Sequence, residues 1–185
     1  MLRTARLLLR PVRRADVDDL YRHINDRDIT RNTLNIPWPY QRSYAQDWVE
    51  ETISDDSPDK GYRFVICLPQ DERLMGMISL RDLPLHHRAE TGYWIGRPYW
   101  NQGYMTEALK AVIDFAFHHT ALRRVQATHF THNPQSGRVM AKAGMRCEGT
   151  LRQYVSKGDE QLDLVMWGIT RLDWLTQQVD QHAER

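Results

Sequence analysis

The sequence predicts a mixed α/β domain in which a mostly antiparallel sheet is flanked by helices. Apolar residues recur at helical spacing in some segments and form short strand-like runs in others. Read along the chain, these segments give one strand, two helices, three strands, a helix, a strand, a helix and two strands. The length of 185 residues suits one domain, and 41% apolar with 26% charged residues suits a globular one.

The first half of the chain is expected to hold a strand, two helices and a three-stranded meander. Residues 7–12 form the opening strand, and a helix follows with its apolar residues at helical spacing: Val17, Leu20, Tyr21 and Ile24. Residues 35–40 hold two prolines around a tryptophan and form a rigid loop. A second helix presents Ala45, Trp48, Val49, Thr52 and Ile53 on one face. A polar turn, 54–61, then leads into strands at 62–68, 74–83 and 90–95, with a turn at 84–88 before the last.

The second half begins with a strongly amphipathic helix, marked by Leu109, Val112, Ile113, Ala116 and Phe117. A strand at 124–130 and a short helix that stops at Gly144 come next. Two last strands, 146–154 and 161–168, are joined by a turn at 157–159. We expect one domain over residues 1–170 and a polar, helical tail over residues 171–185.

Charge and cysteine content limit the functional classes. A net charge of +1 argues against a broad nucleic-acid surface, and the arginines near the N-terminus are expected to be solvated: Arg3, Arg6, Arg10, Arg13 and Arg14. The two cysteines, Cys67 and Cys147, lack metal-ligand spacing and are expected to be free core residues. No apolar run is long enough for a signal peptide or a membrane span. We therefore expect a cytoplasmic protein with no metal, membrane or nucleic-acid partner.

Residues 93–117 carry the strongest functional signal, because a strand leads through a short loop into a long helix. The start of a helix presents unpaired N–H groups and the positive end of its dipole, which together form an anion site. Gly103 lets the main chain approach an anion closely. No P-loop and no G-x-G-x-x-G fingerprint is present. This segment therefore suits a pyrophosphate, although a plain strand-to-helix turn is the alternative.

Several segments together resemble the GNAT acetyltransferases. Residues 100–108, WNQGYMTEA, resemble the loop with which that family holds the pyrophosphate of acyl-CoA. The segments 4–10, 89–94, 133–136, 142–145 and 148–149 resemble further family motifs in the same order. Taken together they are similar to the RimJ/RimL branch, which acetylates the N-termini of ribosomal proteins.

The resemblance implies a twisted sheet whose central strands, 90–95 and 124–130, splay apart around the pantetheine arm of acetyl-CoA. The residues that it implies as contacts of this cosubstrate are Trp94, Ile95, Trp100, Asn101, Gln102, Gly103, Tyr104, Met105, Thr106, Asn133 and Ser136. Trp100 departs from the family pattern, which has Arg or Gln there in many members. Main-chain amides carry most of the phosphate binding, so the binding of CoA is still expected.

The chemistry implied is attack of a neutral amine on a thioester. Main-chain N–H groups near Trp94 and Ile95 would stabilise the developing oxyanion. Glu90 is the candidate base, through a water, with an ordinary strand carboxylate as the alternative. Ser136 would donate a hydrogen bond to the leaving thiolate, with a place in the first turn of the helix as the alternative. The RimL-type glutamate base has no counterpart, because Val155 occupies its position.

The acceptor amine is less well defined. Trp38 and Tyr154 are candidates for the acceptor pocket, and Trp38 is as well explained as an aromatic anchor of its loop. His129 and His132 lie near the predicted acceptor side and could help with proton transfer, whereas the pairs at 86–87 and 118–119 do not suit a metal. A protein N-terminal α-amine is the leading acceptor; the alternative is a small amine, such as a polyamine, an antibiotic or an aminoacyl nucleotide. A CoA-binding module without catalysis is a third hypothesis, and a homodimer is expected by family analogy alone.

Overall fold

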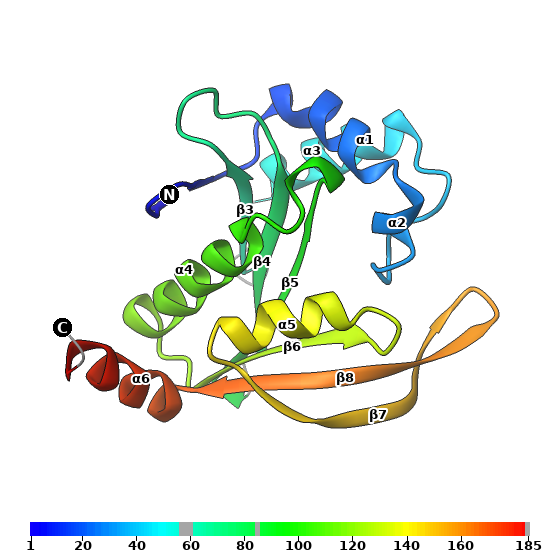
Figure 1. The fold of residues 1–185 in the computed structure, drawn as a ribbon. Coiled ribbons are helices and arrows are strands. Elements are labelled where there is room, and N and C mark those ends of the chain that lie inside the picture. The colour runs from blue at the N-terminus through cyan, green and yellow to red at the C-terminus, as the bar shows by residue number, and fades with distance from the viewer. Residues whose placement is uncertain (56–60, 84–85, 184–185) are drawn as a thin grey trace.

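The computed structural model describes residues 1–55, 61–83 and 86–183 (Figure 1). Within them, one sheet contains eight strands in the order β1-β2-β3-β4-β5-β6-β8-β7. Neighbouring strands are antiparallel except β5 and β6, which run parallel. The strands are β1 (Leu2–Arg3), β2 (Leu8–Arg10), β3 (Tyr62–Cys67), β4 (Gly76–Leu83), β5 (Arg88–Ile95), β6 (Arg124–Phe130), β7 (Arg146–Lys157) and β8 (Glu160–Thr170).

Helices cover both faces of this sheet and confirm the predicted fold class. They are α1 (Val17–Ile24), α2 (Arg27–Thr30), α3 (Arg42–Ser54), α4 (Tyr104–His119), α5 (Pro134–Lys142) and α6 (Arg171–Ala183). Alternate strand residues face opposite sides. Leu7 and Leu9 pack with α4, whereas Leu8 between them packs with α1 and α3. Two apolar cores therefore sit on the two faces of the sheet.

Most of the expected elements are present, with the differences at short segments. The strand β1 and the helix α2 were not predicted. Asp26 caps α2 by accepting a hydrogen bond from the Asp28 N–H at 2.8 Å, and this N-cap residue is a local signal for the helix. The C-terminal helix packs onto the domain through Trp174, which is buried and donates from Nε1 to Asp114 Oδ1 at 2.7 Å. The expected turns at 54–61 and 84–88 lie partly outside the described residues.

The sheet opens between β5 and β6, as predicted for the central strands. Their parallel pairing covers only Arg88–Glu90 against residues 124–126. Beyond this point β5 continues to Ile95 and β6 to Phe130 without pairing to each other. The separation creates a space at the centre of the fold whose walls are two strand edges.

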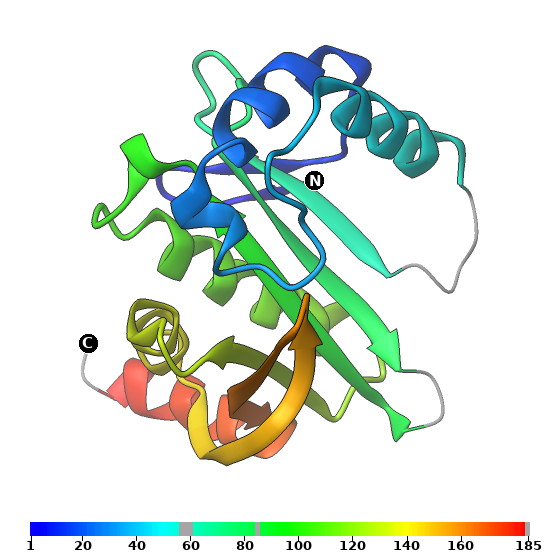
Figure 2. The ribbon, with the colours of Figure 1, turned by 90° about the vertical axis from the view of Figure 1, so that its right-hand side faces the viewer.

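The β7–β8 hairpin reaches across this opening toward α2 (Figure 2). A register shift between Leu151 and Val155 turns the hairpin, and Gln153 adopts a left-handed conformation there, with φ of 48°. Near the tip, the ammonium group of Lys157 donates to the carbonyl oxygens of Thr30 and Thr33. None of the described helices is long and apolar enough to span a membrane.

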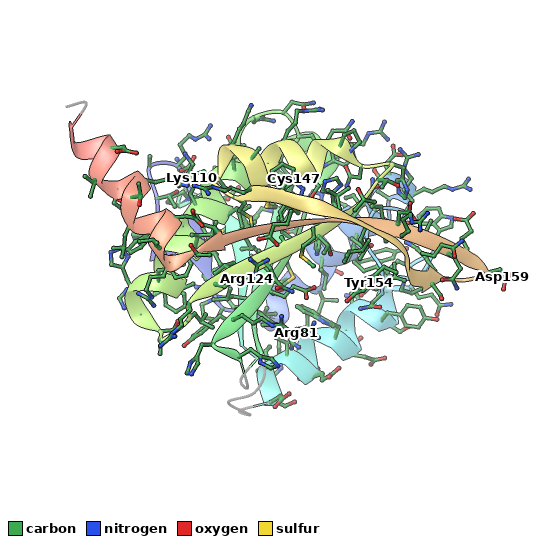
Figure 3. All side chains as sticks on the ribbon, turned by 90° about the horizontal axis from the view of Figure 1, so that it is seen from below. Arg81, Lys110, Arg124, Cys147, Tyr154 and Asp159 are labelled. Carbon is green, nitrogen blue, oxygen red and sulfur yellow. The ribbon has the colours of Figure 1, made fainter. Side chains whose placement is uncertain are left out.

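Two expectations about side chains were wrong. Cys67 is buried, but Cys147 is exposed on the edge strand β7 (Figure 3). Arg10 is not solvated: it is 2% exposed and forms hydrogen bonds to both carboxylate oxygens of the buried Asp16, at 2.9 and 2.6 Å. Arg10 can be buried because its charge is paired with Asp16. Neither the run of arginines nor the strand pattern indicated that Asp16 would be the partner.

Candidate active site

A cleft of about 680 Å³ occupies the opening between β5 and β6. Residues 91–95 of β5, with Thr128 and His129 of β6, form its inner part. The loop before α4 and the first turn of α4 line one side, and α5 lines another. Asp28 and Ile29 of α2, and the residues just after it, Arg31, Asn32 and Thr33, form a further wall. The cleft is therefore one continuous space that joins the predicted CoA loop to α2.

The loop that precedes α4 is held in a shape that suits an anion. Trp100 donates from Nε1 to the Ile95 carbonyl at 2.7 Å, and Gln102 donates from Nε2 to the Pro98 carbonyl at 2.8 Å. Asn101 and Gly103 both have left-handed backbones, with φ of 60° and 80°. The turn brings the N-terminus of α4 to the cleft, where no side-chain hydrogen bond caps this helix within the described residues. Its first N–H groups thus fit a phosphate group.

The opening segment of the chain supports this loop from behind. Glu107, in the first turn of α4, accepts hydrogen bonds from Thr4 Oγ1 at 2.5 Å and from Arg6 Nε at 2.7 Å. Arg6 also donates from Nη1 to the Gln102 carbonyl at 3.0 Å. Burial would raise the pKa of Glu107, but the hydrogen bonds from Thr4 and Arg6 outweigh burial and hold that pKa below its usual value. A charged Glu107 therefore ties the N-terminal segment to the loop.

The charge of the cleft also suits an anionic cosubstrate. Arg138 and Lys142 on α5 and Arg31 after α2 line the cleft, whereas Asp28 is the sole carboxylate among the described lining residues. The cleft thus offers both helix N–H groups and cationic side chains to a pyrophosphate. We conclude that its residues fit acyl-CoA.

Ser136 lies in the first turn of α5 and lines the cleft, and its partner is a residue that sequence reasoning missed. The Tyr93 hydroxyl oxygen is 2.9 Å from Ser136 Oγ and donates to the Ser136 carbonyl at 3.2 Å. Burial raises the pKa of Tyr93 well above its usual value, although the hydrogen bond with Ser136 opposes this rise. The phenol therefore stays protonated and remains able to donate.

Asn133 occupies the predicted N-cap position of α5, with Pro134 following it. Its side chain makes no capping hydrogen bond, and the residue lines the cleft. His129 and His132 line the cleft as well, and His129 Nδ1 is 2.8 Å from the Phe130 carbonyl. Among the described residues, no group of His, Cys, Asp and Glu side chains could hold a metal ion.

Several of the predicted site residues lie outside the cleft lining. Glu90 lies one position before Thr91, and its carboxylate faces Arg81 at 3.8 Å. Trp38 is 51% exposed and Tyr154 is 61% exposed, and neither lines the cleft. Figure 3 places Tyr154 on the hairpin between Cys147 and Asp159, which lies at its tip.

Two polar residues of the predicted motifs, Gln102 and Glu148, form contacts within the protein. Gln102 is absent from the lining and presents its carbonyl to Arg6. Glu148 forms a bidentate pair with Arg124, at 2.6 and 2.5 Å, which joins β7 to β6 across β8. Gly168 of β8 lies under this pair, where a β-carbon would come within 2.5 Å of both side chains. Gln102 and Glu148 thus stabilise the walls of the site.

The comparisons with known proteins agree with this geometry. Residues 6–146 match the family model described as an acetyltransferase (GNAT) domain. The chain is 28% identical over 171 residues to an uncharacterized N-acetyltransferase of Bacillus subtilis, YnaD, which covers 92% of this chain and 97% of that protein. It is 30% identical over 122 residues to the ribosomal-protein-serine acetyltransferase of Escherichia coli, which covers 64% of this chain and 68% of that protein.

The comparison with solved structures indicates the same family. It matches the crystal structure of a GNAT-family acetyltransferase from Bacillus anthracis with a TM-score of 0.82 and 25% identity, covering 92% of this chain and 98% of that chain. The predicted resemblance to the RimJ/RimL branch is confirmed at modest identity, since ribosomal-protein acetyltransferases are among the relatives. The chain therefore belongs to the GNAT family and is an N-acetyltransferase that uses acetyl-CoA.

Proposed function

We propose that this enzyme acetylates the α-amine at the N-terminus of a polypeptide. The observation that carries the proposal is the charge of the cleft. Asp28, the sole carboxylate among the described lining residues, is already within 3.6 Å of Arg31 and 3.2 Å of Arg97. A polyamine acceptor would need several unpaired carboxylates to hold its additional charges. An N-terminus brings a single amine to the reaction and needs none.

The possible proton acceptors among the described lining residues support the same acceptor: they are Asp28, which is already paired with two arginines, and the imidazoles of His129 and His132. An α-amine has a pKa of about 7.7–8.0 and is substantially neutral near neutral pH, whereas a lysine side chain has a pKa of about 10.4. We propose that the acceptor's proton leaves through water toward Glu90, which lies outside the lining. A weak relay of this kind is sufficient for an α-amine and poorly suited to a lysine.

The other residues then have defined roles. Bound acetyl-CoA supplies the acetyl group as a thioester. The first N–H groups of α4 and the cationic side chains of α5 hold the pyrophosphate. Main-chain N–H groups near Trp94 and Ile95 stabilise the negative charge on the thioester oxygen. The Asn133 carboxamide contacts the pantetheine arm, and Ser136 donates a hydrogen bond to the departing sulfur.

The proposal is tested by measuring the release of CoA thiol with a panel of acceptors. The panel contains peptides with free N-termini, the same peptides with formylated N-termini and an internal lysine, spermidine and an aminoglycoside. Wild type is compared with Ser136→Ala and Glu90→Gln. We expect turnover only with free α-amines and about a tenfold lower kcat for Ser136→Ala, the effect of one hydrogen bond. The loss in Glu90→Gln should be larger at about pH 7, where most of the α-amine is protonated, than at about pH 9.

The alternatives give different results in the same assay. Turnover with spermidine or the aminoglycoside, and none with peptides, would assign a small-molecule acceptor. No turnover with any amine, together with thermal stabilisation by CoA, would favour a CoA-binding module without catalysis. A formylated peptide that reacts through its lysine would contradict the argument that only weak bases are available to the acceptor.

A further inference from the structure

The contact between Tyr93 and Ser136 joins two hydroxyl groups that come from different walls of the cleft. Tyr93 lies on β5 and Ser136 on α5, and their oxygens are 2.9 Å apart. The Tyr93 ring is packed against the core around α4, so its hydroxyl position is set by burial. Both residues line the cleft. The function proposed above assigns only the Ser136 hydroxyl to the departing sulfur.

Two hydrogen atoms can be arranged in two ways between these oxygens, because either oxygen can be the donor. In the first arrangement Tyr93 donates to the Ser136 carbonyl at 3.2 Å, and the Ser136 hydroxyl donates back to Tyr93. In the second, Tyr93 donates to Ser136 Oγ, and the Ser136 hydrogen is free to point into the cleft. Rotation of the two hydroxyl groups about their C–O bonds interconverts them, and no heavy atom has to move.

The charge on the sulfur in the cleft determines which arrangement is favoured. A thioester sulfur is a weak hydrogen-bond acceptor, so it cannot compete with the Tyr93 oxygen for the Ser136 hydrogen. A thiolate carries a full charge, and hydrogen bonds to ionised groups are about twice as strong. The second arrangement is therefore stabilised only when charge develops on sulfur, which is the condition for lowering the barrier.

We propose that Tyr93 is a positioning residue for thiolate release, which switches the Ser136 hydrogen from the tyrosine oxygen to the sulfur. The inference rests on the proposed function, and in particular on the role of Ser136. In the reaction, the amine nitrogen forms a bond to the acetyl carbon, the carbon–sulfur bond breaks, and its electron pair goes to sulfur. The amine proton leaves through water. Tyr93 donates to Ser136 Oγ and Ser136 donates to sulfur, and neither hydroxyl loses its proton.

The first test measures the thiol of bound CoA without any turnover. Absorbance of the thiolate is followed while the pH of a stoichiometric complex with CoA is raised. We expect a lower thiol pKa in the wild-type complex than in free CoA, the value of free CoA with Ser136→Ala, and an intermediate value with Tyr93→Phe. Ser136→Thr keeps a hydroxyl and should retain the shift. Tyr154→Phe removes an exposed hydroxyl outside the cleft and serves as the matched control.

The second test is a double-mutant cycle on kcat. We expect about a tenfold loss for Ser136→Ala, a smaller loss for Tyr93→Phe, and a double variant no slower than Ser136→Ala, because Tyr93 acts through Ser136. The affinity for CoA and the thermal midpoint are measured for each variant, to detect a loss of binding or of folding. Tyr93→Phe should show neither loss, because it keeps the buried ring.

The outcomes separate this inference from the proposed function. A Tyr93→Phe complex with the wild-type thiol pKa, or losses that multiply in the double variant, would overturn the switch. A Ser136→Ala complex with an unchanged thiol pKa would overturn it together with the role of Ser136. A normal thiol shift with no turnover on any amine would contradict the proposed function and leave the switch supported.

Discussion

Lys157, near the tip of the β7–β8 hairpin, donates a hydrogen bond from its ammonium group to the main-chain carbonyl of Thr30, at the C-terminal end of α2. The same group also contacts the carbonyl of Thr33. Cations are favoured at the C-terminal ends of helices, where carbonyl groups lack partners. Because Asp28, Ile29, Arg31, Asn32 and Thr33 line the cleft, this contact ties one of its walls to the hairpin.

Replacing Lys157 with Met should therefore weaken acceptor binding more than CoA binding, because the pyrophosphate is assigned to α4 and α5 and the hydrogen bonds of Lys157 go to Thr30 and Thr33. We expect the KM for the acceptor to rise several-fold and the free energy of unfolding to fall by about 1–2 kcal/mol, because charged hydrogen bonds to two carbonyls are lost. Steady-state kinetics with each substrate varied in turn gives the two KM values. Lys110→Met, at an exposed lysine of α4, is the control. An unchanged acceptor KM would show that α2 does not bound the acceptor site.

Gly103 adopts a φ of 80° at the start of α4, a conformation that a β-carbon disfavours by about 1–2 kcal/mol. Gly103→Ala should distort the loop and weaken CoA binding by roughly tenfold, since that loss corresponds to about 1.4 kcal/mol. Gly158→Ala is the matched control: its φ is 60°, and nothing lies within 4 Å of its added β-carbon. Both variants should lose similar stability, and titration calorimetry should detect weaker CoA binding only for Gly103→Ala. Equal affinities in the two variants would contradict the assignment of this loop.

Glu107 should contribute stability that disappears in acid. Its pKa in the folded protein lies below the usual value, so the stabilisation is complete above the unfolded pKa of about 4.3 and is lost as the pH falls through the folded pKa. Glu107→Gln should remove about 1–2 kcal/mol at neutral pH and much less in strong acid. Urea unfolding across the acid range tests this. If the difference between wild type and variant stayed constant with pH, the bonds from Thr4 and Arg6 would not depend on the charge of Glu107.

The buried pair of Arg10 and Asp16 should matter for stability and not for catalysis. Asp16→Asn leaves the guanidinium without its carboxylate, a change that typically costs about 3–5 kcal/mol in a buried pair. Combining it with Arg10→Met should cost less than the sum of the single changes, because the isolated charge is gone. Denaturant midpoints measure the stabilities, and kcat per folded molecule should equal that of wild type. A kcat that falls with stability preserved would give the pair a role in the site.

Local patterns in the sequence were sufficient for most of the elements. The apolar residues of α4 recur at the helical period, and its predicted inner face, from Leu109 to Phe117, is the buried one. The strand 124–130 was predicted with the observed bounds. The motif of residues 100–108 indicated the family, because a helix start, a left-handed glycine and their spacing are local properties. The expected contacts of the loop before α4 with CoA are those that the resemblance to the family implies.

The same patterns did not indicate which distant residues meet. Tyr93 and Ser136 are 43 positions apart, and their contact depends on how α5 lies over β5. Alternation along β5 places Glu90 and Tyr93 on opposite sides of the strand. Residues 91–95 from both sides line the cleft, so alternation did not indicate that Glu90 would lie outside it. The register shift in β7 places Tyr154 in solvent, and a shift of this kind leaves little signature in residue type.

The sequence by itself determined the fold class, the family and the loop that presents the N-terminus of α4, because these depend on periodicity, turn residues and spacing within short segments. Only the tertiary structure decided that Arg10 is buried against Asp16, that Glu90 lies beside Arg81 outside the lining, and that Tyr93 supports Ser136. These relationships are set by strand register and helix packing between segments far apart in the chain. Their energies depend on burial and on the approach of partners, which no local pattern specifies.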